Sequence, residues 1–266
     1  SLGSIHTSLI TTEGRIFTWG SNEYGQLGDG TTIDSLAPVE ITTNFNLNFD
    51  ETISSIALGG RHSALITSQG RVFTWGSNEY GQLGNNSTTT QLFQIDITSF
   101  FNLDLDEKII SISLGEYNSL ALSSEGRLFS WGYNSDGRLG DGTTNDRYIP
   151  TDITTVFKLD EGESFLSIAL GDDHSIALTN KGNVFTWGSM VGGTTTDSPT
   201  PENIIGMFNL IEDESIVDMS LGQSHSSILT SEGRIFTWQN NIHGQLGDGT
   251  TDNSSTPIDI TSQFNL

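Results

Sequence analysis

The sequence predicts an all-β fold, a β-propeller built from five repeat units that each form a four-stranded antiparallel blade. Three observations predict it. One unit of about fifty residues occurs five times, its apolar residues alternate with a period of two, and its third strand has bulky side chains on both faces. Small sheets with apolar residues on both faces can bury both by stacking around an axis, each against its neighbours.

The repeat contains one tryptophan per unit, two residues after a phenylalanine, and successive tryptophans are 56, 56, 56 and 51 residues apart. We expect these side chains to be structural and to fill the space between blades: Trp19, Trp75, Trp131, Trp187 and Trp238. The units are expected at approximately residues 1–50, 51–106, 107–162, 163–213 and 214–266, within a single domain of residues 1–266. The fourth unit lacks the Asn-x-x-Gly-Gln-Leu-Gly loop after its tryptophan, which we interpret as loop variation.

Alternation within a unit indicates strands. Ile110, Ile112 and Leu114 alternate with serines, which indicates a strand. The segment Val72–Trp75 has bulky residues on both faces and follows a tight connection that ends in glycine. An outer strand is expected near Pro38, because an edge strand tolerates a missing backbone N–H.

Composition excludes several classes of function. The 266 residues include 10 Lys and Arg against 33 Asp and Glu, a formal net charge of −23, so nucleic acid is not an expected ligand. The absence of cysteine excludes disulfides and thiolate chemistry. No apolar run approaches the roughly 20 residues that cross a bilayer, so no membrane insertion is expected. Cytoplasmic and extracellular locations both stay open.

Several motifs recur in register: Leu-Gly-x-x-His-Ser, Gly-Arg-(Ile/Val/Leu)-Phe-(Thr/Ser)-Trp-Gly and Asn-x-x-Gly-Gln-Leu-Gly. Over essentially all 266 residues they resemble the regulator of chromosome condensation repeat family. The resemblance implies a seven-bladed propeller, so we expect the five units to be part of a larger ring, truncated at both ends. Their open edges would pair with the missing repeats or with another chain. The resemblance also implies exchange factors for the small GTPase Ran, chromatin-binding, ubiquitin-ligase-associated and light-sensing proteins.

Two of those functions do not fit this sequence. It has no basic arm and a net charge of −23, which argues against nucleosome binding. The plant ultraviolet photoreceptor of the family has tryptophan in a Gly-Trp-Arg-His motif, whereas this chain reads Gly60-Arg61-His62. Light sensing is therefore not expected.

Histidine occupies the third position after the repeated glycine in four units, and the third unit has Asn118 there. Equivalent positions in adjacent blades are too far apart to share a metal ion at about 2 Å, so we expect structural hydrogen bonds and neither a metal site nor a cofactor. These histidines are His6, His62, His174 and His225. The Asp-Gly-Thr-Thr segments lack the spacing of an EF-hand and are expected to form turns.

Carboxylates are clustered just before each predicted inner strand. They are Asp50 and Glu51; Asp104, Asp106 and Glu107; Asp160, Glu161 and Glu163; and Glu212, Asp213 and Glu214. Antiparallel connectivity places them on the same face as the Gly-Arg turns. Two interpretations stay open. The arginines pair with neighbouring acids and the rest is solvated charge, or the acids form a collar that binds a basic peptide.

No catalytic arrangement is visible: the sequence lacks a nucleophile elbow, a phosphate-binding loop and a metal-ligand set. We therefore predict a non-enzymatic scaffold for protein–protein interaction, with a protein or basic peptide as partner. One alternative, guanine-nucleotide exchange on a small GTPase, rests on the family resemblance. Another, a secreted or surface structural repeat protein, is favoured by the Ser/Thr/Asn-rich, lysine-poor composition.

Overall fold

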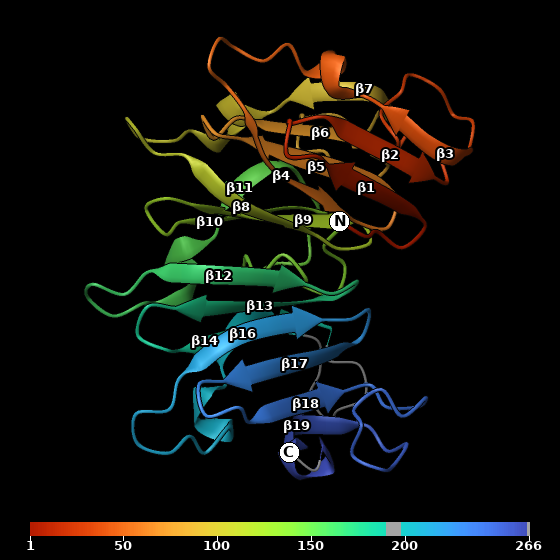
Figure 1. Cartoon of the computed structure of the whole chain (residues 1–266). Coiled ribbons are helices and arrows are strands. Elements are labelled where there is room, and N and C mark those ends of the chain that lie inside the picture. The colour runs from red at the N-terminus through yellow and green to blue at the C-terminus, as the bar shows by residue number, and fades with distance from the viewer. Residues whose placement is uncertain (190–197, 265–266) are drawn as a thin grey trace. The chain divides into compact units, whose positions relative to one another are not determined.

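The computed structural model describes residues 1–189 and 198–264, so most of the short fourth-unit loop lies outside the described residues. The described part contains nineteen β-strands and five short 3-10 helices (Figure 1). The strands form five antiparallel sheets, one for each repeat unit, which confirms the all-β class and the repeat organisation. Among the described residues, no helix is long and apolar enough to cross a membrane.

The chain divides into two compact units. Unit 1 comprises residues 1–134 and 145–154, and unit 2 comprises residues 135–144 and 155–266.

Unit 1 contains three sheets whose strands follow chain order. The first sheet has three strands instead of the predicted four, β1 (His6–Ile10), β2 (Ile16–Gly20) and β3 (Ser35–Glu40). The second has four, β4 (Ile53–Leu58), β5 (His62–Thr67), β6 (Val72–Gly76) and β7 (Gln91–Asp96). The third has β8 (Ile109–Leu114), β9 (Asn118–Ser123), β10 (Leu128–Gly132) and β11 (Arg147–Asp152).

Unit 2 contains two four-stranded sheets of the same order. The first comprises β12 (Phe165–Leu170), β13 (His174–Thr179), β14 (Val184–Gly188) and β15 (Ser198–Asn203). The second comprises β16 (Ile216–Leu221), β17 (His225–Thr230), β18 (Ile235–Gln239) and β19 (Ser254–Asp259).

A 3-10 helix follows each outer strand: η1 (Thr42–Phe45), η2 (Thr98–Phe101), η3 (Thr154–Phe157), η4 (Ile205–Met207) and η5 (Thr261–Phe264). Phe45, at the end of η1, meets the ring of Trp75 in the next repeat edge-on, with centroids 5.7 Å apart. The same contact joins Phe101 to Trp131, Phe157 to Trp187, and Phe208 to Trp238. Edge-to-face pairs of this kind add roughly 0.5–1.5 kcal/mol beyond the burial of area.

The hydrophobic core lies between consecutive sheets of a unit. Leu65 and Trp75 of the second sheet pack with Ile16 and Phe45 of the first repeat, and all four are buried. Four of the five tryptophans are buried. Trp19 is only partly buried.

Candidate functional site

The connections of every sheet lie at two opposite ends of its strands. In the second sheet, the β4–β5 turn and the long β6–β7 loop lie at one end, and we call this end of each sheet the loop face. The β5–β6 turn and the connection to β8 lie at the other end, which we call the acidic face. All four acid clusters lie in connections of the acidic face.

The last acid of each cluster points inward. In the second sheet the Glu51 side chain is 0% exposed, and its Oε2 lies 3.0 Å from Nη1 of Arg71. The same guanidinium contacts Asp96 at 2.8 Å and lies 4.6 Å from the ring centroid of Phe73. This arrangement recurs at Arg127 with Glu107 and Asp152, and at Arg234 with Glu214 and Asp259.

The pKa of Glu51 is set by opposing effects. Burial raises the pKa, but hydrogen bonds from Thr67, the Asn48 amide and Arg71 outweigh burial, so the pKa lies below its ordinary value. Glu51 is therefore a charged structural carboxylate at neutral pH.

In the fourth repeat the equivalent carboxylate, Glu163, is held without an arginine. Asn183 stands at the arginine position, and its Nδ2 donates to Oε1 of Glu163 at 2.7 Å. The hydroxyl of Thr179 donates to the same oxygen at 2.6 Å. Glu163 is only half-buried, and the carboxylate at this position is thus held by whichever donors the repeat provides.

Seven of the eleven predicted acids are exposed. They are Asp50, Asp104, Asp106, Asp160, Glu161, Glu212 and Asp213. Three of them also have a backbone role: Asp50, Asp106 and Asp213 have φ of 63°, 67° and 64°, a left-handed conformation that Asp adopts more readily than most residues. Three further exposed carboxylates that the sequence clusters did not include lie in the turns of this face, Glu13, Glu125 and Glu232.

The repeated histidines join consecutive sheets. Nε2 of His62 lies 3.0 Å from the hydroxyl of Ser119 in the next repeat. The same bond joins His6 to Ser63 and His174 to Ser226. Burial lowers the pKa of His6 to about 4, and burial together with the nearby His6 lowers the pKa of His62 to about 3. Both imidazoles are therefore neutral at pH 7.

At the junction between consecutive sheets, a backbone carbonyl at the loop face accepts hydrogen bonds from the next repeat. Gln26 O accepts a hydrogen bond from the indole of Trp75 at 2.9 Å and from the hydroxyl of Ser63 at 2.8 Å. Gln82 O accepts hydrogen bonds from Trp131 and Ser119 in the same way, and Arg138 O accepts them from Trp187 and Ser175.

The fifth repeat makes this junction differently. Gln239 replaces the glycine that follows tryptophan in the other repeats, and its backbone has φ of 85°. Its Oε1 accepts from the hydroxyl of Ser226 at 2.7 Å. The preceding loop lacks the Gly-Gln-Leu-Gly segment, and Gln239 provides this serine with an acceptor from within its own sheet.

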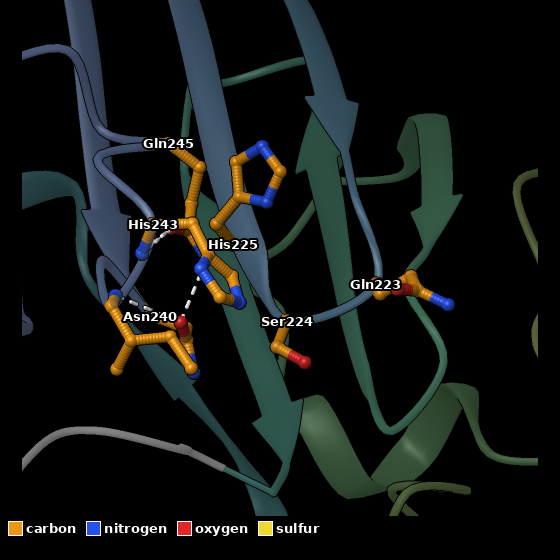
Figure 2. Close-up of a pocket in the computed structure, with 7 residues that line it drawn as sticks. Gln223, Ser224, His225, Asn240, His243 and Gln245 are labelled. Atoms are coloured by element: carbon orange, nitrogen blue, oxygen red, sulfur yellow. Dashed lines mark hydrogen bonds between the residues drawn. The ribbon is translucent and has the colours of Figure 1, made fainter.

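His225 lies in a pocket of about 300 Å³ on the loop face of the fifth sheet. Figure 2 shows Gln223 and Ser224 of one turn on one side, and Asn240, His243 and Gln245 of the long loop on the other. Gln245 is held within the loop, since it donates to Asn240 at 2.7 Å and accepts from the His243 amide at 2.9 Å. The residues that line the pocket include no carboxylate, so they provide no His–carboxylate pair for general acid–base catalysis.

The Asp-Gly-Thr-Thr segments form turns. Oδ1 of Asp29 accepts from the amide and the hydroxyl of Thr31, both at 2.9 Å, and from Nδ2 of Asn22 at 3.1 Å. Asn241 and Asp248 make the equivalent contact in the fifth repeat. These carboxylates therefore hold the long loops in shape.

A family model described as RCC1-like domain matches residues 1–265. The chain belongs to this family. Human HERC2, an E3 ubiquitin-protein ligase, is 32% identical to this RCC1-like chain over 256 residues, which cover 94% of the chain and 5% of HERC2. The Arabidopsis thaliana ultraviolet-B receptor UVR8 is 32% identical over 253 residues, covering 93% of the chain and 54% of the receptor. The chain thus spans about half of UVR8 and a small part of HERC2.

Solved structures agree with this assignment. Human WBSCR16 superposes on the RCC1-like chain with a TM-score of 0.82 at 25% identity, covering 97% of this chain and 65% of that one. Yeast RCC1 (Prp20), solved bound to Kap60, gives a TM-score of 0.76 at 20% identity, covering 98% and 62%. The described sheets thus match part of a propeller, as the family resemblance implies.

Proposed function

We propose that this RCC1-like domain is a non-enzymatic scaffold whose partner is a basic protein or peptide. The excess of exposed carboxylates on the acidic face is the observation that supports it. Ten exposed carboxylates lie in its connections, five in each compact unit, and of the ten seven come from the acid clusters and three from the turns. The arginines of this face are already held by Glu and Asp, so their charge is offset within the chain.

The lysines of this face do not balance its acids. Three exposed lysines lie in its connections, Lys108, Lys158 and Lys181, and Lys181 lies 3.7 Å from Asp160. The field of such a surface attracts polycations, and this attraction weakens as salt rises. The charge of this face would thus mainly raise the association rate of a basic partner and disfavour the binding of acidic proteins.

The test is the affinity of a labelled Lys/Arg-rich peptide between low and physiological ionic strength, measured by fluorescence anisotropy. Removing two exposed charges in D104N/D106N should weaken binding at low salt about two- to thirtyfold, from roughly 0.2–1 kcal/mol per exposed charge. Asn at position 106 keeps the left-handed backbone accessible, so the fold should be preserved.

The control E23Q/D252N removes two exposed charges from loop-face connections and should leave the affinity unchanged. Absence of binding, or binding that neither salt nor the acid variants alter, would contradict the proposal.

Guanine-nucleotide exchange on a small GTPase is the second candidate. Prp20p from Saccharomyces cerevisiae, a structural relative with a TM-score of 0.73 and 20% identity, is described together with its binding properties to Gsp1p and histones. Release of labelled GDP from a panel of small GTPases, with and without this chain, separates the two candidates. Faster release would favour exchange, and unchanged release together with peptide binding would favour the scaffold.

A further inference from the structure

Three tyrosines far apart in the sequence meet on the loop face of unit 1. Tyr80 lies in the β6–β7 loop, Tyr117 in the β8–β9 turn, and Tyr133 directly after β10. The ring centroid of Tyr80 is 5.2 Å from that of Tyr117 and 4.6 Å from that of Tyr133. All three side chains are partly exposed. We call Tyr80, Tyr117 and Tyr133 the tyrosine cluster.

The fold itself does not require this cluster. The position of Tyr133 holds serine or asparagine in the other repeats, at Ser21, Ser77, Ser189 and Asn240. The position of Tyr117 holds Ile5, Arg61, Asp173 and Ser224. Since the other repeats form the same sheets without an aromatic residue at either position, the three rings at this junction need an explanation other than folding.

Carboxylates surround the cluster. Glu79 and Glu116 are the sequence neighbours of Tyr80 and Tyr117, and Glu79 is exposed. The pKa of Tyr80 is raised, first by the charge of Glu79, and the pKa of Tyr117 is raised by burial and by a hydrogen bond with Glu116. Electron-rich ring faces beside carboxylates attract a cation.

The same face already holds one cation on a tyrosine. The guanidinium of Arg61 lies 4.8 Å from the ring centroid of Tyr24, and its Nη1 donates to the Tyr24 hydroxyl at 3.1 Å. Tyr24 occupies in the first long loop the position that Tyr80 occupies in the second. A planar guanidinium can thus both stack on a ring of this face and donate to its hydroxyl.

We propose that the tyrosine cluster, flanked by Glu79 and Glu116, is a binding site for an arginine side chain of a basic partner protein. This inference rests on the proposed function for the charge of the partner, but it places the anchoring contact on the loop face rather than on the acidic face. Arginine is favoured over lysine because a guanidinium stacks on a ring and offers several donors at once.

The experiment uses the whole chain and a short peptide with arginines spaced by glycine and serine. A matched peptide with citrulline keeps the shape and removes the charge, and a lysine peptide keeps the charge and removes the planar group. We expect the arginine peptide to bind most tightly and the citrulline peptide not to bind.

Y133S and Y117L should each weaken binding of the arginine peptide about three- to fivefold, the expected effect of one exposed cation–π contact. Y133S introduces the residue that other repeats have at this position, so it should fold even if Y117L does not. Y148F is the control, because Tyr148 is an exposed tyrosine of β11 outside the cluster and phenylalanine keeps its ring against Gly81.

The outcomes separate the two proposals. If D104N/D106N weakens binding and the cluster variants do not, the arginine site is wrong and the basic scaffold holds. If no basic peptide binds, both are wrong. If the cluster variants abolish self-association of the chain and peptide binding is absent, the occupant is a second copy, and the arginine site is overturned.

Discussion

Replacing Arg127 by methionine would leave Glu107 buried without its cation. The Glu107 side chain is 0% exposed, that of Arg127 is 25% exposed, and the two groups lie 2.8 Å apart. Removing one partner from a buried pair costs about 3–5 kcal/mol, whereas an exposed pair contributes about 0–1 kcal/mol. Because the guanidinium is partly solvated, we expect R127M to lower the free energy of unfolding by about 2–3 kcal/mol at pH 7.

The stability that R127M loses should depend on pH, and the pKa of Glu107 fixes the direction. In the wild type, burial raises the pKa of Glu107, but hydrogen bonds with Ser123, the Asp104 amide and Arg127 bring it below its ordinary value. Glu107 therefore stabilises the wild type above its unfolded pKa of about 4.3, and this contribution is lost as pH falls through the folded pKa. In R127M burial dominates and the pKa rises above the unfolded value. The stability lost at pH 7 should then be partly recovered as pH falls toward about 5.

The assay is urea unfolding followed by tryptophan fluorescence at pH 7 and near pH 5. The control is R127N, because Asn183 holds Glu163 in the fourth repeat, so R127N should lose less stability than R127M. If R127M unfolds at the wild-type urea concentration, or loses equal stability at both pH values, the electrostatic reasoning is refuted.

Three further predictions concern the junctions between sheets. W131A should lower the free energy of unfolding by about 3–5 kcal/mol, and W19A by clearly less because Trp19 is partly exposed; thermal unfolding of both variants checks this. Lowering the pH from about 6.5 should destabilise the wild type, because His62 binds a proton in the unfolded state but stays neutral in the folded state down to its pKa of about 3; H62N should reduce this loss in a pH titration of urea midpoints. S119A removes bonds to His62 and Gln82 O and should cost about 1–3 kcal/mol, measured by urea unfolding.

The strands and the packing of the tryptophans could be predicted because both are encoded locally and repeated. Alternation with a period of two marked strands such as β8, and bulky residues on both faces of β6 indicated cover from both sides. The 3-10 helices were missed, although a phenylalanine recurs in them at Phe45 and Phe101. The sequence shows this recurrence, but not that each ring reaches the tryptophan of the next repeat.

The candidate site could be predicted only in part. Sequence spacing groups Asp50 with Glu51, but the turn conformation exposes one carboxylate and buries the other. The tyrosine cluster could not be predicted, because Tyr80 and Tyr133 are 53 positions apart in the sequence and meet only when two sheets pack. Contacts across a repeat junction depend on tertiary packing, which neither motifs nor local periodicity report.

Gln239 also bears on whether the repeats are interchangeable modules. The second, third and fourth sheets each take an acceptor for their buried serine from the repeat before them, whereas the fifth has its own in the Gln239 side chain. If the fifth repeat were transplanted behind one with a full loop, two acceptors would compete for one hydroxyl where there is no room for a side chain, since a Cβ at the equivalent Gly76 would lie 2.7 Å from Arg61 O and 3.3 Å from the Gln26 Cα. Moving a standard repeat behind the shortened loop would deprive its serine of the usual partner. Shuffling these modules therefore requires that residue 239 and the loop before it be exchanged together.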